Sequence, residues 1–154
     1  MEKELLNSGK ELLLKDLCGR IPYKVRMFEI EPVNNIQSNL TLLSVTNKES
    51  VICITPSGGV IASSIDAFKP YLFPLSSMTE EQLNDFYATI RPVIEEALDA
   101  WKIDKTEYEG ERPITLKDIK ADIVAVNWML KNHFDMNGLI PKGLAIDATG
   151  LNIY

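Results

Sequence analysis

The segment formed by residues 69–82 (KPYLFPLSSMTEEQ) places the strongest constraint on the fold of this 154-residue chain. Its first part is an apolar run interrupted by prolines, and its second part is a strong start signal for a helix. The Thr79 side chain is placed to cap the backbone, and Gln82 three residues later completes a capping box. Met78 and Leu83 have the spacing of a hydrophobic staple. We therefore expect the chain to change here from strands to helices.

Upstream of this segment, the sequence predicts one helix at the N-terminus. A capping box formed by Ser8 and Glu11 begins the helix. Gly19, which can adopt the left-handed conformation, ends it shortly before Pro22. Its apolar stripe consists of leucines at helical spacing: Leu13, Leu14 and Leu17.

From Tyr23 to Ile65 the apolar pattern has a period of two, which is typical of strands. Strands are expected at residues 24–30, 39–46, 50–55 and 60–62. The turns between them, at 47–49 and 56–59, are so short that the strands they join must be antiparallel. This pattern predicts a curved antiparallel sheet of about four strands, and an SH3-like half-barrel is its most specific form.

Downstream of residue 78, two long helices are predicted. The first runs from Thr79 to about Lys102, and Pro92 is expected to kink or split it because proline removes a helical hydrogen bond. A polar loop at 105–112 follows, and Thr115 caps the second helix. Two apolar rows on that helix predict burial on more than one side, so we expect it to be the central packing helix. The inner face predicted for the first helix comprises Leu83, Phe86, Ile90, Val93, Ala97 and Trp101. The first apolar row of the second helix comprises Leu116, Ile119, Ile123, Val126, Leu130 and Phe134. Its second row comprises Ala121, Val124, Ala125 and Trp128.

Together these patterns predict a single α+β domain over residues 1–154. It would contain an N-terminal helix (1–22), an antiparallel sheet (23–66) and a helical part (67–154). Two or three C-terminal helices would pack on the sheet. A chain of this length can bury a sizeable core without a second domain.

The charge of the chain is concentrated in one segment. Residues 79–111 hold ten acidic and three basic side chains and carry a net charge of −7, whereas the rest holds 13 basic and 12 acidic side chains and carries +1. Affinity for nucleic acid comes mainly from Lys and Arg, and no basic stripe is present. We therefore expect no direct binding to nucleic acid.

The cysteines and the apolar segments indicate a cytoplasmic protein. Cys18 and Cys53 lie in apolar surroundings and are expected to be buried thiols without a disulfide partner. The first 17 residues carry charges throughout and do not resemble a signal peptide. The longest uncharged stretch elsewhere, residues 50–65, is too short and too broken by proline and glycine to span a membrane.

One pair of residues suggests catalysis. His133, the only histidine, and Asp135 have the types needed for a general base and the acid that orients it. The alternative is that His133 stands at a helix C-terminus, where its cation suits the dipole and its ring caps a carbonyl. With one histidine and no cysteine at ligand spacing, we expect no metal site, and we name no catalytic or cofactor-binding residue.

Other motifs favour structural roles. The Ser57-Gly58-Gly59 sequence precedes a strand and lacks a P-loop lysine, so it indicates a hairpin turn. Tyr71 and Phe73 could line an aromatic groove or wedge the sheet against a helix. The remaining carboxylates are Asp16, Glu29, Glu31 and Asp66, and the cluster Glu95, Glu96 and Asp99 on an acidic helix.

Three blocks read together resemble a known group of proteins. They are ELLLKDLCGRIPY (11–23), KPYLFPLSSMTEEQ (69–82) and HFDMNGLIPKGLAID (133–147). The set resembles short uncharacterised proteins encoded in prophages and other mobile elements of gut Bacteroidetes. This chain departs from that group at Met136-Asn137, where an aromatic residue and an arginine are common. It also has extra residues ahead of the first block. The resemblance implies a bacterial or phage cytoplasmic setting and no activity.

Three functional hypotheses remain. The first is a non-enzymatic, phage-related accessory protein that binds another protein through an acidic or apolar surface, including mimicry of nucleic acid toward a basic partner. The second is a small-ligand or peptide-binding module that uses a groove beside Tyr71 and Phe73. The third is a hydrolase that uses His133 and Asp135.

Overall fold

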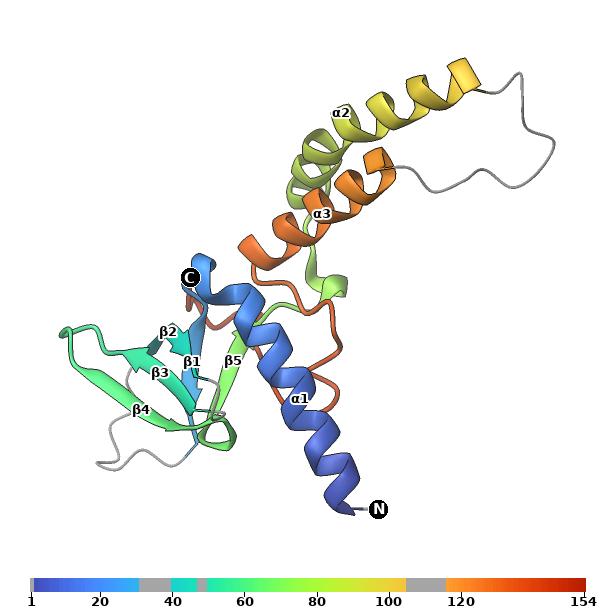
Figure 1. The fold of residues 1–154 in the computed structure, drawn as a ribbon. Coiled ribbons are helices and arrows are strands. Elements are labelled where there is room, and N and C mark those ends of the chain that lie inside the picture. Colours follow the sequence, from blue (N-terminus) through green and yellow to red (C-terminus); the bar gives the residue numbers. More distant parts are fainter. Residues whose placement is uncertain (1, 31–39, 47–49, 105–115) are drawn as a thin grey trace. The chain divides into compact units, whose positions relative to one another are not determined.

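The computed structural model describes residues 2–30, 40–46, 50–104 and 116–154. These residues form the α+β fold that the sequence predicts, with an N-terminal helix, a sheet and two further helices (Figure 1). They divide into two compact units, residues 1–77 with 130–154 and residues 78–129. We call them the sheet unit and the helical unit. The expectation of a single domain stays a prediction.

Helix α1 covers Glu2–Arg20 and is longer than predicted. Ser8 lies inside it, so the predicted capping box at Ser8 is wrong. Gly19 is helical too, and the left-handed residue is Lys24, which follows the 3-10 turn η1 (Ile21–Tyr23). A Cβ atom at Gly19 would lie 3.3 Å from the Leu130 side chain, so this glycine makes room for a close neighbour.

The sheet has six strands: β1 (Arg26–Glu29), β2 (Leu40–Val45), β3 (Ser50–Ile54), β4 (Val60–Ser64), β5 (Phe68–Leu72) and β6 (Ile146–Asp147). Their order is β4-β3-β2-β1-β5-β6, and only β5 and β6 are parallel. The first four strands match the predicted meander. The sheet is open, however, so the predicted SH3-like form is not closed into a barrel.

Strands β5 and β6 lie in the part of the chain that was predicted to be helical. Strand β5 alternates buried and half-buried residues as a strand should. It contains Pro70, which has no N–H to donate and therefore argues against a strand inside a sheet. Pro70 nevertheless lies opposite Met27 of β1. The 3-10 turn η2 (Ile65–Ala67) connects β4 to this new position beside β1.

The core of the sheet unit lies between α1 and the sheet. Leu13 and Leu17 of α1 are buried against Val25, Met27 and strand residues, as their helical and strand periods predict. Figure 1 shows α1 lying across the sheet. The remaining members of this core cluster are Leu40, Leu42, Val51, Cys53, Ile65, Phe68, Leu72, Leu139 and Ala145.

Helix α2 (Glu80–Asp104) begins with the predicted capping box. The Thr79 N–H donates to Gln82 Oε1 at 2.9 Å, and the Gln82 N–H donates to Thr79 Oγ1 at 3.2 Å. The 3-10 turn η3 (Leu75–Ser77) precedes it. The helix continues through Pro92, so it is not split there, and the kink that was the alternative stays a prediction. Leu83, predicted on the inner face, is exposed.

Helix α3 (Leu116–Lys131) runs antiparallel to α2. This follows from two contacts, because Trp128 near the end of α3 bonds to Asp85 near the start of α2, whereas Lys120 pairs with Glu96. The described parts therefore form a helical hairpin. Some predictions lie outside the described residues. They concern the turn at 47–49, the loop at 105–112, the Thr115 cap and the Glu31 carboxylate, and the side chains of Ala97, Asp99 and Trp101.

Candidate functional site

The residues His133 and Asp135 follow the end of α3 and are fixed to the strand segment around Phe73. The Phe73 N–H donates to the His133 carbonyl at 2.9 Å, and the Asp135 N–H donates to the Phe73 carbonyl at 2.8 Å. His133 has a φ of 60°, in the left-handed region. The chain therefore turns sharply at His133 and joins the edge of β5.

The carboxylate of Asp135 is occupied by the backbone. Its Oδ1 accepts a hydrogen bond from the Leu139 N–H at 2.8 Å, and its Oδ2 accepts one from the Ile140 N–H at 2.9 Å. Asp135 is also buried. It organises the turn that follows and does not hydrogen bond to His133. The predicted base and orienting acid are not assembled into a pair.

The ring of His133 stacks on Tyr154, with ring centroids 4.0 Å apart and planes 14° apart. Burial, followed by the charges of Arg20 and Arg26, lowers the pKa of His133 to about 4. The imidazole is therefore neutral at pH 7, and the predicted stabilisation of a helix dipole by its cation is wrong. Its Nδ1 is buried without a hydrogen-bond partner.

A buried ion pair beside this segment was not found from the sequence. Arg20 is fully buried, and its Nε and Nη2 donate to the two carboxylate oxygens of Asp16 at 2.5 and 3.1 Å. Nη2 also donates to the Phe134 carbonyl at 2.8 Å. Asn137 donates from Nδ2 to Asp16 Oδ1 at 2.8 Å. The available signal was the spacing, because Asp16 and Arg20 fall on the same face of α1 as Leu13 and Leu17.

The two cysteines differ. Cys53 is buried, and burial followed by the charge of Glu29 raises its thiol pKa to about 12. At neutral pH this thiol is protonated and is a poor nucleophile. Cys18 is exposed, which corrects the prediction that both thiols are buried.

The aromatic residues of the segment 69–82 pack against other rings. Phe73 lies 6.3 Å from Phe134 and 5.7 Å from Tyr154, measured between ring centroids. Tyr71 meets Phe28 edge to face at 6.2 Å. These contacts favour the packing role over the aromatic groove. The Ser57-Gly58-Gly59 turn joins β3 to β4, as predicted, and Gly58 takes a φ of 87°.

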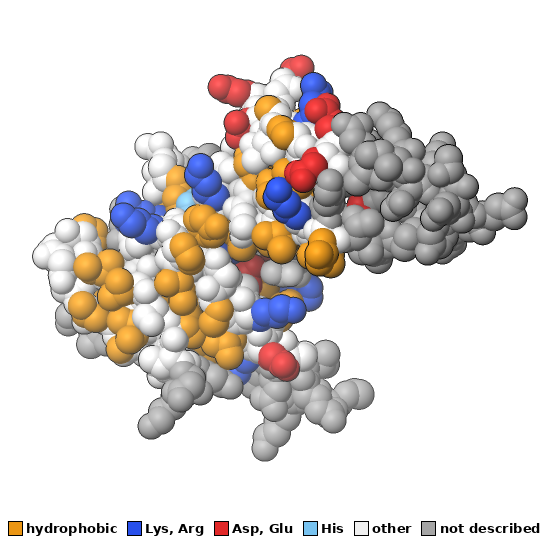
Figure 2. Space-filling view, turned by 45° about the horizontal axis from the view of Figure 1, so that its top comes forward, with side chains coloured by type: hydrophobic (Ala, Val, Ile, Leu, Met, Phe, Trp, Pro, Cys, Tyr) orange, Lys and Arg blue, Asp and Glu red, His pale blue; other side chains and the backbone are white. Residues whose placement is uncertain are grey.

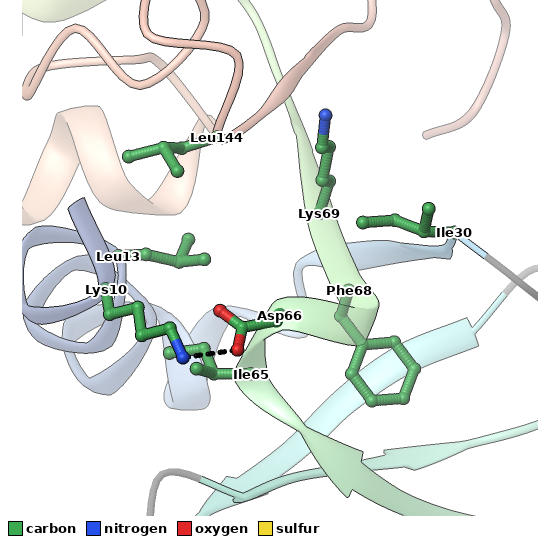
Figure 3. Close-up of a pocket in the computed structure, with 8 residues that line it drawn as sticks. All are labelled: Lys10, Leu13, Ile30, Ile65, Asp66, Phe68, Lys69 and Leu144. Carbon is green, nitrogen blue, oxygen red and sulfur yellow. Dashed lines mark ion pairs between the residues drawn. The ribbon is translucent and has the colours of Figure 1, made fainter. Parts of the chain in front are cut away.

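The sheet unit contains a pocket between α1, η2, β5 and the C-terminal segment (Figure 3). Its volume is about 90 Å³, and most of its lining is apolar. Its residues are Lys10, Leu13, Ile30, Ile65, Asp66, Phe68, Lys69 and Leu144. Two of these residues, Lys10 and Asp66, form an ion pair (Figure 3). No sequence motif pointed to this place, because its residues come from four separate stretches of the chain.

The helical unit presents apolar side chains at its surface. Leu116, Ile119, Ile123 and Val126 of α3 are exposed by 85, 46, 55 and 44%. This corrects the prediction that α3 is a central packing helix buried on more than one side. The opposite face of α3 does pack on α2, where Trp128 meets Phe86 with ring centroids 5.1 Å apart. Figure 2 shows hydrophobic and acidic side chains close together on the helical unit.

The described residues offer neither a metal site nor a membrane span. No three His, Cys, Asp or Glu side chains in the described ranges come together in a way that could hold a metal ion. Within the same ranges, every helix is too short or too polar to cross a membrane. No protein-family model, curated protein or solved structure matches this chain.

Proposed function

We propose that this chain is a non-enzymatic accessory protein that binds another protein through the exposed face of α3. The observation that carries this proposal is the row of four exposed apolar residues on α3, which we call the α3 stripe: Leu116, Ile119, Ile123 and Val126. Large apolar residues that are contiguous on a protein surface often mark an interaction site, whereas single scattered ones do not.

The spacing of the α3 stripe favours a helix as the bound element. Its members are separated by three, four and three residues, which is the a and d spacing of a coiled coil. Ile119 and Trp128 are nine residues apart, so they point in opposite directions, at about 180° around a helix with 3.6 residues per turn. One face of α3 therefore packs on α2 while the other is free to receive a third helix.

Charge favours a basic partner over a second copy of this chain. The segment 79–111, most of which forms α2, carries a net charge of −7. Two such hairpins would repel each other, whereas a helix with Lys or Arg beside its apolar face would be attracted. The partner we propose is therefore a protein that presents a basic amphipathic helix. The resemblance to phage-encoded proteins is consistent with this class of function.

A defined peptide pair tests the proposal. The full chain is titrated with a four-heptad helical peptide that has Leu at its a and d positions and Lys at e and g, and with a version that has Glu at e and g. We expect the Lys peptide to bind at least about tenfold more tightly, with the preference weakening as salt is added. Equal affinity for the two peptides, or binding of neither, would contradict the proposal.

Two double variants of equal charge locate the surface. Ile119→Lys with Ile123→Lys interrupts the α3 stripe. Asn84→Lys with Ala88→Lys changes the net charge equally at two exposed positions of α2. Only the first pair should abolish binding of the Lys peptide. Light scattering after size exclusion should show a monomer, and a dimer that the first pair dissociates would show that a second copy occupies the stripe.

A further inference from the structure

The pocket of the sheet unit is a second site, independent of the α3 stripe. It forms where α1, the end of β1, the η2–β5 junction and the C-terminal segment meet. In Figure 3, Leu13 and Leu144 stand on one side of the pocket, and Ile30 and Lys69 stand on the other. All of these elements belong to the same compact unit, so the pocket is a feature of one folded body.

The walls of the pocket are apolar and well supported. Leu13, Ile65 and Phe68 are buried, and they belong to the main core cluster. Leu144 packs beside α1, since a Cβ atom at Gly9 would lie 3.7 Å from its side chain. A pocket lined in this way should keep its shape in the absence of a ligand, which reduces the entropic cost of binding.

The volume limits what the pocket can take. It is about 90 Å³, smaller than an engineered apolar cavity of about 150 Å³ that admits benzene in another protein. A short branched aliphatic group fits this space better than an aromatic ring. The hydrophobic contribution from such a small group is modest, so a charged contact is needed to orient it.

One cation that lines the pocket, Lys69, has no counter-ion among the described residues. The Lys10 ammonium is paired with Asp66, so those two charges largely cancel each other. Lys69 is half-buried and forms no hydrogen bond or ion pair with another residue in the described ranges. The described lining residues therefore carry one positive charge in excess, beside an apolar wall. One ammonium matches a carboxylate better than a phosphate, which takes more charge and more donors.

We propose that this pocket binds a short aliphatic carboxylate, with the aliphatic chain against Leu13, Ile65 and Leu144 and the carboxylate on Lys69. The same chemistry occurs in a free branched-chain acid and in the C-terminal leucine of a peptide. A free acid is the smaller of the two and needs no further room. This binding activity lies outside the helical unit and does not depend on the α3 stripe.

Amide NMR spectra of the full chain, recorded during titration, test the proposal. Isocaproate should shift the amide signals of Leu13, Ile65, Lys69 and Leu144, with a Kd on the order of 1 mM for so small a ligand. Isohexanol and isohexylamine have the same aliphatic chain without the carboxylate, and each should bind at least about tenfold more weakly. N-acetyl-leucine binding more tightly than isocaproate would identify a peptide C-terminus as the source of the ligand.

Matched lysine variants provide the decisive control. Lys69→Met keeps the length of the side chain, removes the charge and should weaken isocaproate binding at least about tenfold. Lys15→Met removes a charge from an exposed position of α1 that does not line the pocket, and binding should be unchanged. Dispersed amide spectra of both variants verify that each is folded. Unchanged affinity in Lys69→Met, or shifts that fall away from the pocket, would overturn the proposal.

Discussion

The two compact units of this protein differ in what they bury. The sheet unit buries three charged residues, Asp16, Arg20 and Asp135. Arg20 and Asp16 hydrogen bond to Phe134 and Asn137, which are far away in the sequence, whereas Asp135 accepts from the nearby Leu139 N–H. Both units expose large apolar residues, but among the described residues of the helical unit only Ile90 and Trp128 are buried apolar side chains. The first unit is specified by long-range contacts, and the second by pairing of two helices that are near neighbours in the sequence. Polar groups inside one unit define its structure, and apolar groups outside the other suit it for binding.

Parts of the three sequence blocks, residues 11–23, 69–77 and 133–147, meet in the sheet unit. Arg20 from the first block donates to the Phe134 carbonyl in the third. Phe73 from the second block exchanges backbone hydrogen bonds with His133 and Asp135 in the third. The second and third blocks also pair as strands β5 and β6. These parts of the blocks therefore form a single packed junction.

The largest effect that we expect comes from breaking the buried ion pair. Arg20→Met should lower the free energy of unfolding of the sheet unit by about 3–5 kcal/mol, because it leaves the Asp16 carboxylate buried without its cation. Lys10→Met removes the partner of the more exposed Asp66 and should cost at most about 1 kcal/mol. Urea unfolding followed by amide NMR would measure both changes.

A double variant distinguishes loss of charge pairing from loss of packing. Asp16→Leu combined with Arg20→Met should be more stable than Arg20→Met alone, because no charge remains buried. If the double variant is no more stable than the single one, packing of the arginine side chain accounts for the loss. Both tryptophans, Trp101 and Trp128, lie in the helical unit, so their fluorescence reports whether that unit is unaffected.

A second experiment applies one kind of truncation to both units. Leu17→Ala should destabilise the sheet unit by about 3 kcal/mol, because Leu17 is fully buried and truncation leaves a cavity. Ile123→Ala should change the stability of the helical unit by at most about 0.5 kcal/mol, because more than half of Ile123 is already exposed. Urea titrations with amide NMR and tryptophan fluorescence measure the two units separately. A large loss for Ile123→Ala would show that α3 is covered in solution.

Local signals predicted the fold best. The capping box of Thr79 and Gln82 depends on residues three apart, and it was predicted correctly. Four strands were predicted from their period of two, because alternation follows from strand geometry alone. Strand β5 was missed because the apolar run that contains Pro70 was assigned to the helical part, and its place beside β1 depends on contacts outside the segment. Strand β6 has two residues, too few to produce any period.

The candidate sites were much less predictable. The pocket draws Lys10, Ile30, Lys69 and Leu144 from distant parts of the chain, and no spacing connects them. The α3 stripe was visible as an apolar row, but the sequence could not show that it is exposed. His133 and Asp135 are neighbours in sequence, yet backbone donors occupy the carboxylate. Proximity in the sequence therefore indicated a pair that the fold does not make.

The titration of His133 tests how strongly the sheet unit opposes a buried charge. Its pKa is about 4 in the folded protein, against about 6.5 in an unfolded chain, so the folded state binds this proton less readily. Its contribution to stability is complete above about pH 6.5 and is lost as the pH falls toward 4. After allowance for partial exposure of the ring, we expect a loss of about 2 kcal/mol.

His133→Asn isolates this effect. Asparagine tolerates the left-handed backbone at this position and does not titrate. The chain has one histidine. Any difference between the two proteins in how the free energy of unfolding depends on pH therefore comes from His133. Urea unfolding at intervals from pH 4 to pH 7 should give a shallower curve for the variant. Parallel curves over that range would mean that the ring is more exposed than its stacking on Tyr154 indicates.

The smallest effect concerns the boundary between the units. Thr79→Ala removes the hydroxyl that accepts from the Gln82 N–H, and it should cost the helical unit about 1 kcal/mol. Thr79→Ser keeps the oxygen and should cost little. Thr79 follows the boundary between residues 77 and 78 and belongs to the helical unit. Tryptophan fluorescence should therefore show a lower free energy of unfolding for the helical unit, while amide signals show an unchanged one for the sheet unit. Equal losses in both units would show that they unfold together, and the contrast between them would then be one of surface and core within a single cooperative domain.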